Sequence, residues 1–192
     1  MAETPKPSRE AEILDAATQV FLRYGFRKTS MDEVARAAGL SRQALYLRFA
    51  GKRELFQATV ERMIGQVRAA ALAALDHEGR APADRLADAL TALNGDATGA
   101  SGVVIRELLQ ETAGVSGPLL DRLRGDVTAA IADLLRRTGI AERWQDAGLT
   151  AGELAEHLYL LPPAVALAGQ DAAEQRRALY TAARVITRGH PG

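Results

Sequence analysis

A short segment in the first third of the chain contains side chains suited to direct contact with DNA bases. Arg42 can bond to guanine O6 and N7, Gln43 to adenine N6 and N7, and Ala44 can touch a thymine methyl group. Leu45 and Phe49 form an apolar helical stripe in this segment. The side chains that fall off the stripe, and that can therefore face DNA, are Arg42, Gln43, Ala44, Tyr46, Leu47 and Arg48.

Two hydroxyl residues and one lysine near this segment are candidates for contacts with DNA phosphates. Thr29 and Ser30 stand where a helix is expected to begin. Their hydroxyls can cap that helix or, together with its unpaired N–H groups, bind a phosphate, and the two roles are compatible. Lys52 is either a solvated surface charge or a phosphate contact, and its place at the start of the next helix favours the second.

Two short helices joined by a tight turn must position these residues. Ser30 can cap the first helix, with Glu33 three residues later completing a capping box. Gly39 stands where the chain leaves that helix through a left-handed residue, and Ser41 can cap the second helix. The small side chain of Ala35 lets the two helices approach closely, as a helix-turn-helix requires.

Composition favours an intracellular DNA-binding protein. The 192 residues contain no cysteine, which excludes disulfides and cysteine-based sites. No apolar run approaches the ~20 residues of a membrane span, and the start lacks the apolar core of a signal peptide. We therefore expect a cytoplasmic protein with no membrane partner. Net charge is zero, but residues 1–60 contain ten Lys and Arg against seven Asp and Glu, a modest indication of nucleic-acid binding.

The apolar pattern along the chain is helical throughout, and strand patterns are nearly absent. We predict an all-α fold of about nine helices. Residues 1–56 form a three-helix head and residues 57–192 form a larger bundle, the body, with the boundary near Gln57 inside a long helix. Besides the two helices of the helix-turn-helix, the expected helices are Ser8–Tyr24, Lys52–His77, Asp84–Asn94, Val103–Ala113, Leu119–Thr138, Thr150–Ala168 and Asp171–Arg188.

The first 56 residues contain a set of positions whose residue types and spacing match a known family. The matching positions are Ile13, Ala16, Ala17, Phe21, Gly25, Phe26, Thr29, Ser30, Met31, Val34, Ala35, Ala38, Gly39, Leu40, Ser41, Leu45, Tyr46, Phe49, Lys52, Leu55 and Phe56. In these positions the chain closely resembles the tetracycline-repressor (TetR) family of bacterial transcriptional regulators. The resemblance outside the head is in outline only. It implies an all-helical homodimer that binds a palindromic operator and usually releases it when a small molecule binds the body.

The same resemblance implies that Tyr46 contacts a DNA phosphate, although a half-buried core tyrosine with a solvated hydroxyl is the alternative. Many members of the family have lysine, proline-like residues or glycine at the places of Arg42 and Gln43. The departure implies a different operator and not a lost function.

The last two expected helices resemble the dimerisation module of the family, in which four helices from two subunits pack together. A purely internal helix pair is the alternative. Pro162 and Pro163 predict a kink or a restart in the first of these helices. The expected interface residues are Leu154, Leu158, Leu161, Val165, Leu179, Ala182, Val185 and Ile186.

A cavity for a small, largely apolar effector is expected among the helices Lys52–His77, Val103–Ala113, Leu119–Thr138 and Thr150–Ala168. Its candidate lining residues are Met63, Val67, His157 and Tyr159, with Arg106 available to an anionic ligand if it turns inward.

The sequence shows no catalytic constellation and no phosphate-binding loop, and its three histidines are isolated, so we expect no enzyme, no cofactor and no metal. We predict a ligand-responsive repressor. An activator or a constitutive DNA binder without effector stays open, as does, less favoured, a helical enzyme that binds a small molecule.

Overall fold

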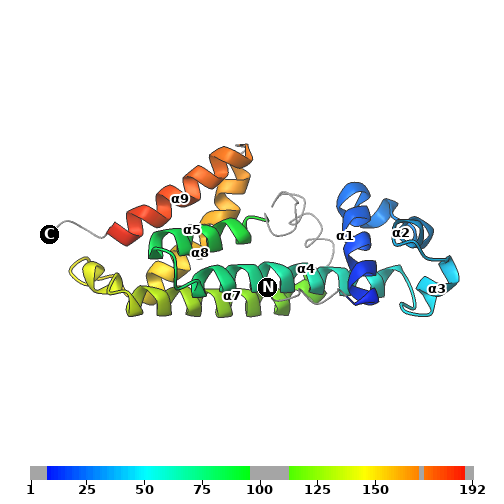
Figure 1. The fold of residues 1–192 in the computed structure, drawn as a ribbon, viewed down its shortest axis with the longest axis horizontal. Coiled ribbons are helices and arrows are strands. Elements are labelled where there is room, and N and C mark those ends of the chain that lie inside the picture. Colours follow the sequence, from blue (N-terminus) through cyan, green and yellow to red (C-terminus); the bar gives the residue numbers. More distant parts are fainter. Residues whose placement is uncertain (1–7, 96–112, 169–170, 189–192) are drawn as a thin grey trace. The chain divides into compact units, whose positions relative to one another are not determined.

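The computed structural model describes residues 8–95, 113–168 and 171–188, and these are helical with no strand among them (Figure 1). The predicted all-α fold is confirmed. The predicted helix Val103–Ala113 lies outside the described residues except for Ala113, which begins α7. The elements are α1 (Arg9–Lys28), α2 (Met31–Ala37), α3 (Arg42–Tyr46), α4 (Lys52–Asp76), α5 (Pro82–Leu93), α7 (Ala113–Arg137), the 3-10 helix η2 (Ala141–Trp144), α8 (Ala151–Leu167) and α9 (Ala172–Arg188).

The described residues group into two compact units. The first unit contains the chain up to Met63 and the start of α7 through Gly117, and the second contains the chain from Ile64 and the rest of α7 from Pro118. Helix α4 thus contributes residues to both units. The functional boundary near Gln57 stays a prediction. No helix within the described ranges combines the length and the apolar character needed to cross a membrane.

The core of the first unit is built around an aromatic cluster. The rings of Phe21 and Phe26 each lie 4.7 Å from the ring of Phe56, which the first turns of α4 supply. Phe21 and Phe56 are almost fully buried, and so is Leu45 of α3. Helix α2 packs against both α1 and α3. Burial of these large apolar side chains holds the short helices α2 and α3, which are too short to be stable alone.

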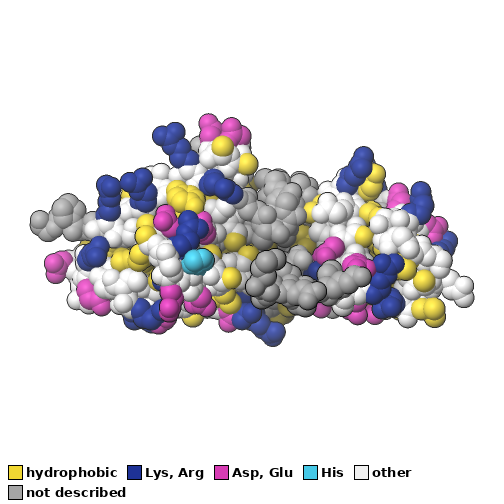
Figure 2. All heavy atoms as spheres, in the orientation of Figure 1, with side chains coloured by type: hydrophobic (Ala, Val, Ile, Leu, Met, Phe, Trp, Pro, Cys, Tyr) yellow, Lys and Arg dark blue, Asp and Glu magenta, His cyan; other side chains and the backbone are white. Residues whose placement is uncertain are grey.

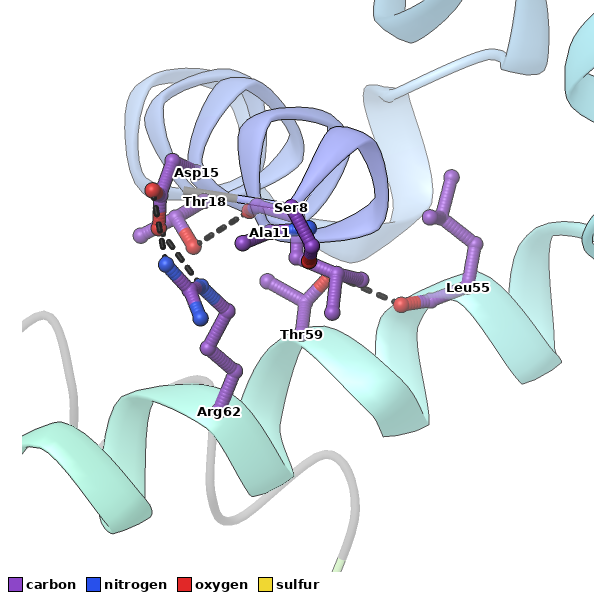
Figure 3. A network of polar contacts seen from close by, with 8 residues as sticks. Ser8, Ala11, Asp15, Thr18, Leu55, Thr59 and Arg62 are labelled. Atoms are coloured by element: carbon purple, nitrogen blue, oxygen red, sulfur yellow. Dashed lines mark hydrogen bonds and ion pairs between the residues drawn. The ribbon is translucent and has the colours of Figure 1, made fainter. Parts of the chain in front are cut away.

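An ion pair fixes α4 to α1 at the edge of this core. The guanidinium of Arg62 donates to both carboxylate oxygens of Asp15, at 2.7 and 2.8 Å, in the two-point arrangement that Figure 3 shows. The bond to Asp15 raises the pKa of Arg62. Beside it, the hydroxyls of Thr18 and Thr59 donate to carbonyl oxygens of their own helices. The pair therefore orients the first part of α4 relative to α1.

The second unit packs α5 against α8 and α9, and α8 against α9. The buried Arg85 donates from Nε to the carbonyl of Leu75 at 2.7 Å, which satisfies the end of α4. Arg68 of α4 bonds to Asp126 of α7 at 2.6 Å. The indole of Trp144 in η2 donates to the carbonyl of Ile186 near the end of α9 at 2.9 Å.

Three prolines of the second unit lie inside helices. Pro162 and Pro163 are both within α8, which is one helix from Ala151 to Leu167, so the predicted restart does not occur. Pro118 lies inside α7, which begins at Ala113 instead of the predicted Leu119. The restart was predicted at Pro162 and Pro163 because a proline lacks an N–H donor and clashes with the carbonyl four residues back. The start at Leu119 was predicted from the apolar stripe alone, and α7 begins before that stripe.

Candidate nucleic-acid interface

A capping box fixes the start of α2, as predicted. The hydroxyl of Ser30 accepts from the backbone N–H of Glu33 at 3.3 Å, and the backbone N–H of Ser30 donates to the Glu33 carboxylate at 2.7 Å. The Ser30 hydroxyl also donates to that carboxylate, at 2.8 Å. These bonds from Ser30 lower the pKa of Glu33, with a smaller contribution from the charge of Arg36.

The turn between α2 and α3 follows the predicted pattern. Gly39 has φ of 63°, in the left-handed region where a side chain would strain the backbone. The N–H of Leu40 donates to the carbonyl of Ala35 at 2.8 Å, which closes α2. The hydroxyl of Ser41 accepts from the N–H of Ala44 at 3.1 Å and caps α3. The turn and both caps therefore set the angle between the two helices.

The side chains of α3 divide between core and solvent as the stripe predicted. Leu45 is fully buried, and Phe49 just after the helix is 5% exposed. Arg42, Gln43 and Arg48 are exposed, and Ala44 is half-buried. Tyr46 is 40% exposed and Leu47 is 82% exposed. Leu47 directly follows α3, whose own leucine is buried, and an apolar side chain as exposed as this one suggests a contact surface.

Arg42 is held by two neighbours in the first unit. Its Nη1 lies 3.3 Å from Oδ2 of Asp32, on the first turn of α2. Its Cζ lies 5.4 Å from the centre of the Tyr46 ring, one turn further along α3. The sequence analysis missed Asp32, because a bond between residues ten positions apart across a turn leaves no periodic signal.

Lys52 and Thr29 face the interior of the first unit. The Lys52 ammonium donates to the carbonyls of Phe26 at 3.0 Å, Arg27 at 3.3 Å and Thr29 at 3.0 Å. It also lies 4.6 Å from the centre of the Phe26 ring. Thr29 is 2% exposed and its hydroxyl donates to the carbonyl of Gly25 at 2.8 Å. The donors of both side chains are thus engaged inside the first unit, and their predicted contact with DNA phosphates stays a prediction.

Charges on the first unit are mixed. On the face drawn in Figure 2, dark blue Lys and Arg side chains over α1–α3 alternate with magenta Asp and Glu side chains. A hollow of about 400 Å³ lies between α1 and α2, where Arg23, Tyr24, Glu33 and Arg36 contribute polar groups. This face therefore lacks an unbroken basic patch, and the exposed side chains of α3 remain the best-defined contact surface.

The four described candidates for effector contacts are spread over two helices. Met63 and Val67 of α4 are buried, with 5% and 9% exposure. His157 is exposed and its Nδ1 lies 2.7 Å from the carbonyl oxygen of Glu153. Tyr159 is half-buried, and this burial raises its pKa. Arg106 lies outside the described residues.

A hollow of about 340 Å³ occurs elsewhere in the second unit, between α4, α5 and α9. Its polar groups bond to one another: the hydroxyl of Tyr180 donates to Asp88 at 2.7 Å, and Arg80 pairs with the same carboxylate. Within the described ranges, no three residues of metal-binding type lie together.

The eight candidates for a dimer interface differ in exposure. Leu154, Leu158 and Leu179 are at most 4% exposed within the single chain, so they have almost no surface to offer a second subunit. Val185 is 57% exposed. The remaining four are half-buried: Leu161, Val165, Ala182 and Ile186.

Two exposed leucines of α8 were not among the predicted interface residues: Leu160 is 57% exposed and Leu167 is 64% exposed. They lie seven positions apart, which places them on one face of the helix. The predicted stripe through Leu154 and Leu158 is the face of α8 that packs inside its own chain. Periodicity identifies an apolar stripe but does not tell which partner covers it.

Comparison with known proteins extends over the head and most of the body. Residues 13–59 match the family described as bacterial regulatory proteins, tetR family. The HTH-type transcriptional repressor BepR of Brucella suis biovar 1 is 33% identical over 148 residues, which are 71% of this chain and 70% of that protein. This chain belongs to the TetR family. It is a DNA-binding transcriptional regulator and not an enzyme.

Two further relatives match over shorter stretches of the chain. The HTH-type transcriptional activator FasR of Mycolicibacterium smegmatis is 38% identical over 60 residues, 31% of this chain and 27% of that protein. The regulator YfiR of Bacillus subtilis is 45% identical over 56 residues, 29% of this chain, and is matched over 27% of its own length.

Solved structures match along nearly the whole chain. A TetR-like transcriptional regulator from Rhodococcus sp. RHA1 is 27% identical with a TM-score of 0.60, covering 98% of this chain and 100% of that one. The fatty acid degradation regulator FadR from Bacillus halodurans is 15% identical with a TM-score of 0.68, covering 97% and 100% of the two chains. At 15% identity, the likeness to FadR concerns the fold alone.

Proposed function

We propose that this protein is a repressor that binds a palindromic operator as a homodimer and releases it when a small, largely apolar molecule binds. The observation that supports this most directly is the division of α3 between a buried anchor, Leu45, and an exposed face that includes Arg42, Gln43 and Leu47. A helix held by one face against a helix-turn-helix core presents its other face to the major groove.

The exposed residues of α3 divide into two proposed roles. Arg42 and Gln43 contact base edges through bidentate bonds, and Ala44 and Leu47 make apolar contacts with thymine methyl groups. Tyr46 and Arg48, with Ser30 at the start of α2, contact the phosphate backbone and set the register. We place Thr29 and Lys52 behind this surface, where their bonds hold α2 and α4 in place. Residues 1–56 are thus the proposed DNA-binding domain.

We propose that α8 and α9 form the subunit interface within a dimerisation and ligand-binding domain, residues 57–192. The exposed Leu160, Leu167 and Val185 support this, because each is an apolar side chain that water would otherwise cover. In a two-fold dimer the same patch is used by both subunits. Two heads then place their α3 helices in successive major grooves about 34 Å apart, which requires a palindromic site.

Repression is favoured over activation by the extent of the matches. BepR, a repressor, matches over 71% of this chain, including much of the body. FasR, an activator, matches over 31% of this chain. We give the longer match more weight, because a match over 71% of the chain must include residues outside the head. The protein acts where the chromosome is, so we place it in the cytoplasm.

The effector proposal depends on the apolar character of the helices in the second unit. Val127, Ile131 and Leu134 of α7 are buried, and so are Ala71 and Leu75 of α4. A small molecule that separates such helices meets mostly hydrocarbon, so it is itself largely apolar. To release the operator, the ligand must bind the form that does not bind DNA more tightly than the other form, by about 5 kcal/mol for a nearly complete switch.

Selection of binding sites from random DNA tests the proposal. The purified full-length protein should enrich a palindrome whose half-sites are one helical turn apart, and an isolated half-site should bind much more weakly. A reporter with the selected site overlapping its promoter should be repressed by the protein. Enrichment of no sequence would refute the assignment of the operator, and an increase in reporter output would identify an activator.

A further inference from the structure

One acidic residue lies within the proposed DNA-contact surface. Asp32 is on the first turn of α2, and its Oδ2 lies 3.3 Å from Nη1 of Arg42 at the start of α3. Both side chains are largely exposed, at 50% for Asp32 and 64% for Arg42. An exposed pair of this kind contributes about 0–1 kcal/mol to stability. Asp32 also gains about 0.3–1 kcal/mol from the dipole of α2, because it stands in the first turn of that helix, but this gain does not require the bond to Arg42.

The position of Asp32 is unfavourable for general DNA binding. Affinity for DNA of any sequence comes mainly from basic groups that replace counterions at the phosphates, and a carboxylate beside that surface opposes it. The same pair restricts the base-contacting residue. Arg42 has a long, flexible side chain, and here Asp32 holds one side of its guanidinium while the Tyr46 ring lies 5.4 Å from its Cζ.

The remaining donors of this guanidinium suit one base edge. Asp32 engages Nη1, which leaves the other N–H groups of the planar fork for a second partner. Guanine presents two adjacent acceptors, O6 and N7, in the major groove, and two parallel N–H bonds from an arginine match them. A guanidinium held in one orientation loses less conformational entropy when it makes this contact.

We propose that Asp32 is a positioning residue that orients Arg42 for guanine and so sets one base preference of each half-site. This inference rests on the proposed function, because it assumes that α3 contacts base edges. Asp32 then lowers the affinity for DNA of any sequence and raises the preference for guanine over other bases at the one position of each half-site that Arg42 contacts. Specificity is a difference between affinities, so a residue that weakens all binding can still sharpen recognition.

The test compares the full-length protein with Asp32→Asn, Arg42→Ala and the double variant in selections from random DNA. When the selected sites are aligned, those of the wild type should show guanine in one symmetric pair of columns, and those of Arg42→Ala should lose this guanine. Asp32→Asn should lower the guanine preference in those same columns by roughly tenfold, while leaving the other columns unchanged. Asp32→Asn should also bind random DNA more tightly, and the double variant should select as Arg42→Ala does.

Asp15→Asn is the matched control, because it removes an equal charge from another Asp–Arg pair of the first unit. It should change no column of the selected site. Thermal unfolding of Asp32→Asn confirms that the variant folds. The inference is overturned if Asp32→Asn keeps the guanine columns, weakens all columns equally, or changes only columns that Arg42→Ala leaves intact. A wild type that selects no site at all would instead overturn the proposed function itself.

Discussion

Replacement of Lys52 by methionine separates a structural role from a DNA contact. In the structure the Lys52 ammonium bonds to three carbonyl oxygens at 3.0, 3.3 and 3.0 Å. A cation at the first residue of a helix opposes the dipole of that helix, so Lys52 is unfavourable for α4 taken alone. Its bonds to the carbonyls at the end of α1 and before α2 offset this cost.

The size of the effect follows from these contacts. One hydrogen bond to a charged group contributes about 1.5–3 kcal/mol, and we take this range for the three bonds together because Lys52 is only half-buried and water replaces part of what is lost. The contact with the Phe26 ring at 4.6 Å adds to it. Methionine keeps the apolar stem and removes the repulsion from the helix dipole, which returns about 0.3–1 kcal/mol. Lys52→Met should therefore lower the free energy of unfolding by about 2 kcal/mol, a fall in Tm of roughly 4–8 °C for a chain of this length. Urea unfolding and calorimetry measure both values.

Operator binding at several salt concentrations provides the second measurement. A lost phosphate contact lowers the slope of log affinity against log salt concentration by about 1, whereas a lost internal bond leaves the slope unchanged. We expect an unchanged slope. Unchanged stability with a lower slope would refute the structural role and restore Lys52 as a phosphate contact. Arg53→Met is the control for stability, since Arg53 is its exposed neighbour and should change unfolding by no more than about 0.5 kcal/mol.

Three further predictions concern base contacts, assembly and pH. Gln43→Ala should relax the preference at one or two symmetric base pairs and cost about 1–3 kcal/mol per half-site; an unchanged selected site would show that α3 is misplaced. Val185→Glu should yield monomers in light scattering without unfolding the chain. Leu158→Glu should unfold the chain, because it buries a charge in the chain's own core. An intact Val185→Glu dimer would exclude the face of α9 that contains Val185 as the interface. Bonds from Ser30 lower the pKa of Glu33 in the folded chain. The stability that Glu33 contributes is therefore complete above the ordinary glutamate pKa of about 4.3, and it is lost as the pH falls through the lower pKa of the folded chain. The free energies of unfolding of Glu33→Ala and of the wild type should converge at low pH, and a difference that stays constant with pH would contradict this role of Glu33.

Features determined by neighbouring residues could be predicted from the sequence. The capping box of Ser30 and Glu33 and the left-handed Gly39 depend on residues at most a few positions apart. The burial of Leu45 and Phe49 follows from helical spacing in the same way. Local hydrogen bonding and backbone sterics therefore define the helix-turn-helix before any distant contact forms.

Features determined by distant contacts could not be predicted in this way. Lys52 is exposed on a helical wheel, and only the folded chain brings the carbonyls of Phe26 and Thr29 to its ammonium. The pairing of Asp32 with Arg42 has the same origin. In α8, Leu158 and Leu160 are equally apolar, and tertiary packing alone decides that the first is buried and the second exposed.

The bond between η2 and the end of α9 gives the protein a built-in optical probe. Trp144 is the single tryptophan of the chain, and its indole donates to the carbonyl of Ile186 at 2.9 Å, while Arg143 donates to the carbonyl of Thr187 at 2.9 Å. Together these two side chains satisfy carbonyls at the last turn of α9, which would otherwise lack partners. Because indole emission depends on hydrogen bonding and polarity, the intrinsic fluorescence of the unlabelled protein reports whether the end of α9 is docked. Val185 precedes the bonded Ile186, so the same emission should change when the proposed dimer forms at this helix, without any added dye.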